Sequence, residues 1–157
     1  MEFIDLLVRL SLSIVLCGLI GLERKIYKKP AGFRTNVLVG LGSTLLMIIG
    51  ISILSEYNDG NTVDITRLAG QIVTGIGFLG AGAIIQGRGS VHGLTTAASI
   101  WVVAAIGMAV GLGFYLEAIL ATLLTLVVLV ILGRVEHRFE ARIEEYIVEH
   151  DHINDEK

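Results

Sequence analysis

Five long apolar stretches, separated by short polar segments, dominate this chain. We expect each stretch to form a helix, over residues 3–22, 35–54, 65–86, 94–112 and 114–133. Each is close to the roughly 20 residues that cross a hydrocarbon layer of about 30 Å. Helices are favoured over strands because the stretches are continuous, and because a lipid-exposed segment must satisfy its own backbone hydrogen bonds. The pattern therefore predicts an all-α, polytopic membrane protein with five transmembrane helices.

Composition agrees with a membrane location, and the charge pattern orients the chain. Hydrophobic residues make up 54% of the 157 residues, above the roughly 45–50% that is usual for soluble domains. Five basic residues fall between residues 23 and 34, and five more lie at Arg88 and beyond residue 133. The segments expected on the opposite side carry acids and no Lys or Arg. Because basic residues favour the cytosolic side, the N-terminus is predicted outside and the C-terminus in the cytosol.

Two parts of the chain are expected to differ in character. Residues 1–133 are predicted to form the transmembrane domain. Residues 134–157 are predicted to form a short cytosolic amphipathic helix followed by a disordered tail. The apolar face of that helix repeats every four residues, at Val135, Phe139, Ile143 and Ile147.

Three separated motifs carry a resemblance to a known family. They read GLIGLERKIYKKPAGFRTNVLVGLGS, DITRLAGQIVTGIGFLGAGAII and VHGLTTAASIWVVAAIGMAVGLG. In this order and at this spacing they closely resemble the membrane domain of the MgtC/SapB family, over roughly residues 6–133. The chain stops about 24 residues after the last predicted helix, so it is expected to be the short, SapB-like form. That form lacks the C-terminal ACT-like domain of some members.

The resemblance implies a multi-pass protein of the bacterial cytoplasmic membrane. It also implies a link to magnesium homeostasis, to adaptation to low magnesium and to virulence, and for MgtC itself restraint of the F-type ATP synthase. The favoured hypothesis is a homodimeric regulator of another membrane complex, such as that synthase. The alternative is a magnesium or other cation transporter, or a channel, that works as an oligomer.

Enzymatic activity is not expected. The sequence holds no Ser/His/Asp arrangement, no Cys or His spacing typical of metal sites and no cofactor loop. Magnesium is the single ligand under consideration, and no other cofactor is predicted. The expected partners are the lipid bilayer, a second copy of the chain and another membrane complex, not nucleic acid.

Candidate metal ligands are the carboxylates Glu23 and Asp64, because magnesium prefers oxygen ligands. As alternatives, Glu23 anchors the chain at the membrane interface or pairs with Arg34, and Asp64 caps a helix and pairs with Arg67. Thr95 or Thr96 is also placed to cap the fourth helix. The polar cluster expected around these carboxylates comprises Arg24, Arg34, Thr35, Arg67, Gln71, Thr95 and Thr96.

Small residues are predicted to let helices approach closely. They are Gly75, Gly77, Gly80 and Gly82 in the third helix, and Gly107 and Gly111 in the fourth, near Trp101. The favoured interpretation is close packing of these two helices, or of two protomers. The alternative is a third helix broken at its glycines, whose freed carbonyls bind a cation. In the first helix, Asp5 and Arg9 are expected to pair at four-residue spacing, unless Arg9 faces Glu117.

Overall fold

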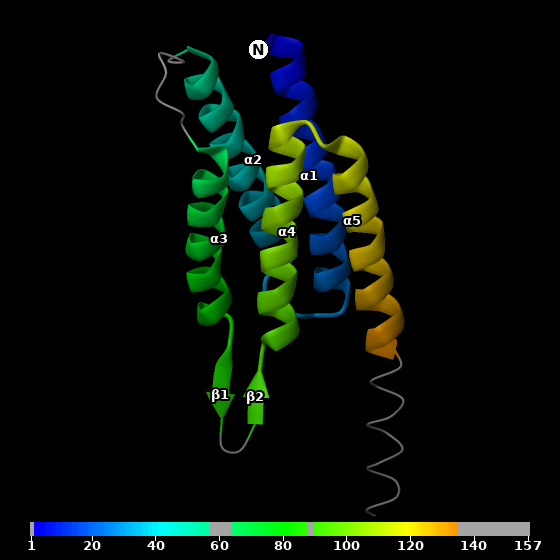
Figure 1. Ribbon diagram of the computed structural model, residues 1–157. Coiled ribbons are helices and arrows are strands. Elements are labelled where there is room, and N and C mark those ends of the chain that lie inside the picture. Colours follow the sequence, from blue (N-terminus) through cyan, green and yellow to red (C-terminus); the bar gives the residue numbers. More distant parts are fainter. Residues whose placement is uncertain (1, 57–63, 88–89, 135–157) are drawn as a thin grey trace, which may run out of the picture. The chain divides into compact units, whose positions relative to one another are not determined.

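The computed structural model describes residues 2–56, 64–87 and 90–134, and five α-helices dominate it (Figure 1). These helices confirm the predicted all-α class, and successive helices run in opposite directions. A short antiparallel hairpin, in which Ile85 pairs with His92, lies between the third and fourth helices. The elements are α1 (Phe3–Ile26), α2 (Phe33–Glu56), α3 (Ile65–Gly82), β1 (Ile85–Gly87), β2 (Ser90–His92), α4 (Leu94–Leu112) and α5 (Tyr115–Val127).

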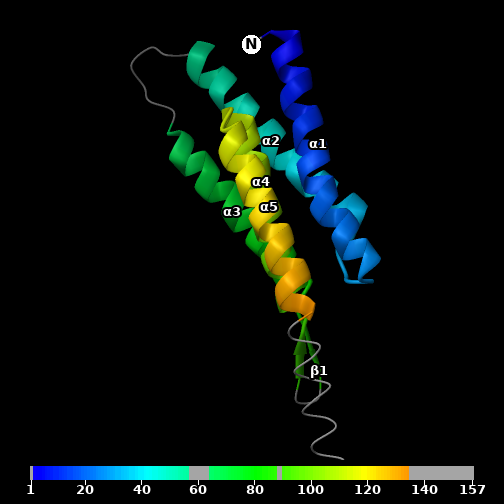
Figure 2. The same ribbon diagram turned by 90° about the vertical axis from the view of Figure 1, so that its right-hand side faces the viewer.

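The connection from α3 to α4 differs from the prediction. The third helix was expected to reach residue 86 but ends at Gly82, and the hairpin extends beyond it in both views (Figure 1, Figure 2). Gly93 turns the chain back into α4 with φ of 91°, a left-handed conformation that glycine adopts without strain. A β-carbon there would also collide with the carbonyl oxygen of Ala83.

The glycines of α3 do not interrupt it. Residues 65–82 form one continuous helix that passes through Gly75, Gly77 and Gly80. The alternative of a broken helix with freed carbonyls is therefore wrong for this structure.

Four of the described helical segments are long and apolar enough to cross a membrane. They are Phe3–Ile26, Phe33–Leu54, Leu94–Leu112 and Tyr115–Leu132. The helix α3 is not among them, because Arg67, Gln71 and several glycines lower its hydropathy. It nevertheless runs beside α2 and α4 (Figure 1). The five-span count and the orientation remain predictions.

The core lies where α1, α2 and α4 meet. Half of α4 is buried, the largest share of any candidate span, which makes it the central helix. The outward faces carry large exposed apolar side chains, such as Leu38 at 66% and Leu124 at 64%. Such faces suit contact with lipid rather than water. The fully buried core side chains include Cys17, Ile20, Met47, Val103, Ile106 and Val110.

Residues up to Thr125 form one compact unit, and the described residues from Leu126 onward belong to a second. In this second unit the helix continues as a π-helical turn over Val128–Leu132 and ends, within the described range, at Arg134. The amphipathic helix predicted after residue 134 lies outside the described residues.

Candidate functional site

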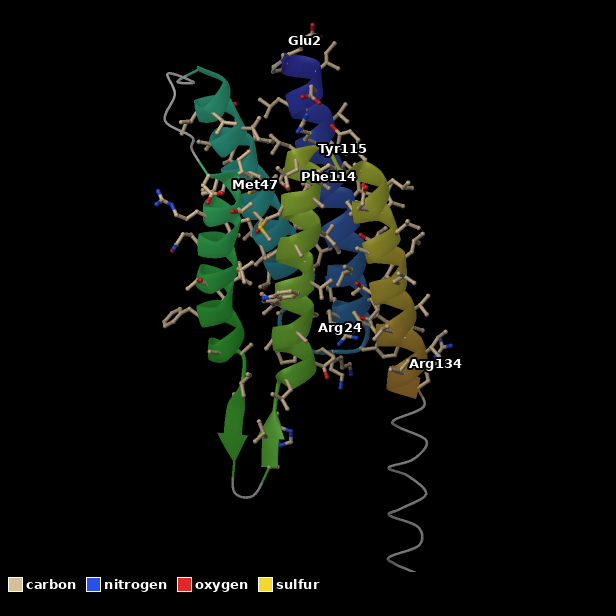
Figure 3. All side chains as sticks on the ribbon, viewed as in Figure 1. Glu2, Arg24, Met47, Phe114, Tyr115 and Arg134 are labelled. Atoms are coloured by element: carbon tan, nitrogen blue, oxygen red, sulfur yellow. The ribbon has the colours of Figure 1, made fainter. Side chains whose placement is uncertain are left out.

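A buried ion pair lies at the end of α1. The guanidinium of Arg24 donates through Nε and Nη2 to the two carboxylate oxygens of Glu23, and the two side chains are only 4% and 7% exposed. The partner of Glu23 is thus its sequence neighbour rather than Arg34, which is exposed. Figure 3 places Arg24 at the end of the helix bundle opposite Glu2. Because each charge neutralises the other, Glu23 is already engaged before any cation arrives.

The turn from α1 into α2 packs tightly against this end of α1. A β-carbon at Gly21 would lie 2.8 Å from the α-carbon of Phe33, so the two helices touch through backbone. Asn36 is fully buried; its Nδ2 donates to the carbonyls of Ala31 and Gly32, while its Oδ1 has no partner among the described residues. This amide was not among the predicted site residues. In the sequence, the feature that could have identified Asn36 is its position as a single amide at the start of an apolar stretch.

The first turn of α4 lies at the same end of the helices (Figure 1). Its N-cap is Gly93, with no side-chain cap, so the prediction that Thr95 or Thr96 caps this helix is wrong. Thr95 is exposed, whereas Thr96 and Ser99 are buried. The hydroxyl of Ser99 donates to the carbonyl oxygen of Thr96 at 2.8 Å. These residues add hydroxyls but no charge to the end of the helices that holds Glu23 and Arg24.

A second polar cluster lies in the middle of the core and joins three helices. Thr44 of α2 donates from Oγ1 to the carbonyl oxygen of Gly107 in α4, at 2.7 Å. The Oγ1 of Thr44 also lies 2.8 Å from Oγ of Ser13 in α1. Both hydroxyls are fully buried. Sequence reasoning missed this cluster, because isolated hydroxyls in apolar helices carry little signal.

Most of the glycines predicted to pack α3 against α4 have other surroundings in the structure. Gly107 and Gly111 of α4 face α2 rather than α3, and a β-carbon at Gly111 would lie 2.7 Å from Thr44. In α3 it is Gly80 that packs against α4. A β-carbon added at Gly80 would lie 3.6 Å from the β-carbon of Ala97. The remaining predicted packing glycines of α3 have open space around them, and Trp101 is half-exposed. Those glycines are Gly75, Gly77 and Gly82.

A groove of about 560 Å³ lies between α2 and α3. Its lining is mostly apolar, and a β-carbon at Gly42 or Gly75 would meet no atom within 4 Å. Its polar lining comes from Gln71 and Ser43. Ser43 is 2% exposed, and its hydroxyl has no hydrogen-bond partner among the described residues. By contrast, the buried hydroxyl of Thr122 donates to the carbonyl four residues back.

The end of the helices opposite the Glu23–Arg24 pair holds the other predicted carboxylate, Asp64. It caps α3 by accepting from the backbone N–H groups of Thr66 and Arg67, which confirms the capping interpretation. The hydrogen bond from the Thr66 hydroxyl, followed by the backbone bonds, lowers the pKa of Asp64 below its ordinary value. Asp64 and Arg67 are exposed. The predicted site residue Thr35, in the first turn of α2 at the other end of the helices, is exposed as well.

Arg9 joins α1 to the connection between α4 and α5. It pairs with Asp5 at 3.0 Å, as expected from their spacing, and donates from Nη1 to the carbonyl of Gly111 at 2.6 Å. Its guanidinium also lies over the ring of Tyr115, 6.0 Å from the ring centre, so it faces Tyr115 rather than Glu117. A cation at the C-terminal carbonyls of α4 is favourably placed against the helix dipole.

These positions bear directly on metal binding. Within the described ranges, three or more His, Cys, Asp or Glu side chains nowhere gather as a metal site would require. Glu23 ends α1 while Asp64 begins α3, at opposite ends of the helices (Figure 1). The two predicted ligands therefore cannot hold one ion together within a single chain.

Comparisons with known proteins give the family. A profile of the MgtC family matches residues 10–138. The chain is 44% identical to YhiD of Escherichia coli strain K12, whose name provisionally assigns magnesium transport; the match covers 85% of this chain and 63% of YhiD. It is 37% identical to the protein SapB of Bacillus subtilis strain 168, over 78% of this chain and 54% of SapB. It is 40% identical to the protein MgtC of Brucella abortus strain 2308, over 74% of this chain and 46% of MgtC.

The chain thus spans about half to three-fifths of the length of these relatives. No solved structure matches it. The family profile covers most of the chain, including α2, α3, α4 and the Glu23–Arg24 pair. The protein belongs to the MgtC family.

Proposed function

We propose that this protein is a regulator in the bacterial cytoplasmic membrane, which acts in magnesium homeostasis by binding another membrane complex. The family assignment and the names of the relatives support the link to magnesium. The F-type ATP synthase is the first complex to test. The regulator acts as a homodimer in this proposal.

The observation that carries the proposal is the groove between α2 and α3. Transmembrane helices associate through small residues that allow close approach and through polar side chains that bond across the interface. The groove offers both, with glycines at positions 42 and 75 and the exposed side-chain amide of Gln71. A helix of the partner complex would fill the groove and exchange hydrogen bonds with the Gln71 amide.

The interior of the bundle argues against conduction by a single chain. Magnesium holds its waters strongly and binds through carboxylates and other oxygens. The buried polar side chains described here are neutral, apart from Glu23 and Arg24, which neutralise each other. Gly107 and Gly40 close the space between α2 and α4 by direct backbone contact.

Filling the groove provides the experiment. Gly42→Leu and Gly75→Leu place a side chain in open space, so both variants are expected to fold. The matched control is Gly77→Leu, which also adds a side chain in open space but does not line the groove. Affinity purification of the tagged full chain from membranes should recover the ATP synthase with the wild type and the control, and not with the groove variants.

Recovery of a different complex would keep the regulator and change its partner. Equal recovery of the same partners by the groove variants and the control would overturn the groove as the binding site. Loss of recovery in all three variants would point to a fold defect, which circular dichroism of the purified proteins detects.

Transport by an oligomer is the second candidate, favoured by the name of the YhiD relative. Magnesium flux into liposomes that hold the purified protein tests it directly. Flux above empty liposomes that is lost in Asp64→Asn, which keeps a capping side chain at an exposed position, would establish transport. Flux equal to that of empty liposomes, with intact protein, favours the regulator.

A further inference from the structure

The turn between α1 and α2 carries exposed positive charge, and among the side chains that the structure describes no free carboxylate lies beside it. Lys25, Lys28, Lys29 and Arg34 are all exposed. The fifth basic residue of this segment, Arg24, is buried and paired with the nearby Glu23. The other carboxylates whose side chains the structure describes lie in the first turns of α1 and α5 and at the cap of α3, which Figure 1 shows at the opposite end of the helices. They are Glu2, Asp5, Asp64 and Glu117.

The backbone beneath these cations is held in place by hydrogen bonds. The N–H of Lys29 donates to the carbonyl of Arg24 at 2.9 Å, and the N–H of Lys28 donates to that of Lys25 at 3.1 Å. The Nδ2 of the buried Asn36 donates to the carbonyl oxygens of Ala31 and Gly32, which holds the chain just after the lysines. The cations therefore start from a defined turn, so little ordering is needed when an anion binds.

Exposed apolar side chains lie in the same turn. Ile26 is 74% exposed, Tyr27 43% and Phe33 37%. A dissolved anion would bond to the cations alone and leave these side chains in water. A phospholipid meets both features, because its phosphate attracts Lys and Arg while its glycerol and acyl region covers apolar and aromatic side chains.

We propose that the α1–α2 turn is a binding site for an anionic phospholipid of the leaflet that it faces. The phosphodiester is held by Lys25, Lys28, Lys29 and Arg34, and the first part of the acyl chains packs on Ile26, Tyr27 and Phe33. On the orientation that the basic residues predict, this is the cytosolic leaflet.

The test uses the full chain, purified in detergent and stripped of lipid. Phosphatidylglycerol or phosphatidylcholine is added at matched concentrations, and retained lipid is measured by native mass spectrometry together with the melting temperature. The wild type should retain phosphatidylglycerol in preference to phosphatidylcholine. A Lys28→Gln, Lys29→Gln variant should lose affinity for phosphatidylglycerol by about fivefold for each cation removed.

Three controls make the outcome decisive. Arg67→Gln removes an exposed cation at the other end and should leave retention unchanged. Ile26→Ser should weaken binding of the lipid, and inorganic phosphate at equal concentration should raise the melting temperature far less than the lipid does. Equal retention of the two lipids, an unaffected Lys28→Gln, Lys29→Gln variant, or full stabilisation by inorganic phosphate would each overturn the lipid site.

Discussion

Gly107 of α4 lies directly against Gly40 of α2, so that a β-carbon at position 107 would stand 3.0 Å from the α-carbon of Gly40. This contact brings the backbones of two central helices together. It also allows the hydroxyl of Thr44 to reach the carbonyl oxygen of Gly107 across the interface. Close approach and an interhelical hydrogen bond are the two contributions that hold helices together in lipid, where water supplies no hydrophobic driving force.

Replacing Gly107 by Ala should therefore destabilise the protein. The added methyl group meets backbone that cannot yield easily, and overpacking of this kind costs about 1–3 kcal/mol. The matched change is Gly77→Ala, where the methyl group enters open space and should cost nothing. Thermal unfolding in detergent micelles measures both. Equal melting temperatures for the two variants would show that α2 and α4 do not touch at these glycines.

The hydroxyl of Thr44 should contribute on its own. Thr44→Val keeps the shape of the side chain but removes the bonds to Gly107 and Ser13. Measured interhelical bonds suggest a loss of about 0.6–1.7 kcal/mol. Thr74→Val removes a hydroxyl that bonds only within its own exposed helix turn, and serves as the control. The unfolding free energies of the two variants, taken in the same detergent, would be indistinguishable if the buried bond were unimportant.

The helix contacts could be foreseen only in part. Glycine spacing in a membrane helix predicts close packing but does not identify the neighbour, so Gly107 and Gly111 were assigned to α3 although they face α2. The neighbour is decided by the complementary small residue, Gly40, which belongs to a distant stretch. The helices themselves could be predicted from the sequence, because a continuous apolar segment in lipid must satisfy its own backbone hydrogen bonds and a helix does so.

The candidate site could be foreseen to a similar degree. Charge at the membrane edge drew attention to Glu23 and Arg24, since an ionisable group there requires a partner. Their pairing with each other depends on rotamers and burial that sequence does not report. The sequence indicated even less about Ser43 and Asn36, because a single polar side chain in an apolar helix most often forms a hydrogen bond with the backbone of its own helix.

The capping role of Asp64 predicts a pH dependence of stability. Its hydrogen bonds lower its pKa in the folded protein below the ordinary value of 3.8. The stabilisation is therefore fully present above that ordinary value and is lost as the pH falls through the lowered pKa of the folded state. Asp64→Asn keeps a capping side chain that does not titrate. Melting temperature measured between pH 6 and about pH 2.5 should fall further in the wild type than in Asp64→Asn, and parallel curves would remove Asp64 as the cause.

The buried pair at the end of α1 gives the sharpest expectation about stability. Removing one partner leaves the other charge buried without compensation, which costs about 3–5 kcal/mol in protein interiors. Glu23→Gln and Arg24→Met should therefore each destabilise the protein strongly. The double variant removes both charges and should cost much less than the sum of the two single changes. Unfolding free energies of the four proteins in one detergent complete the cycle. Additive costs would mean that Glu23 and Arg24 act independently, and that the carboxylate of Glu23 is free for another partner such as a cation.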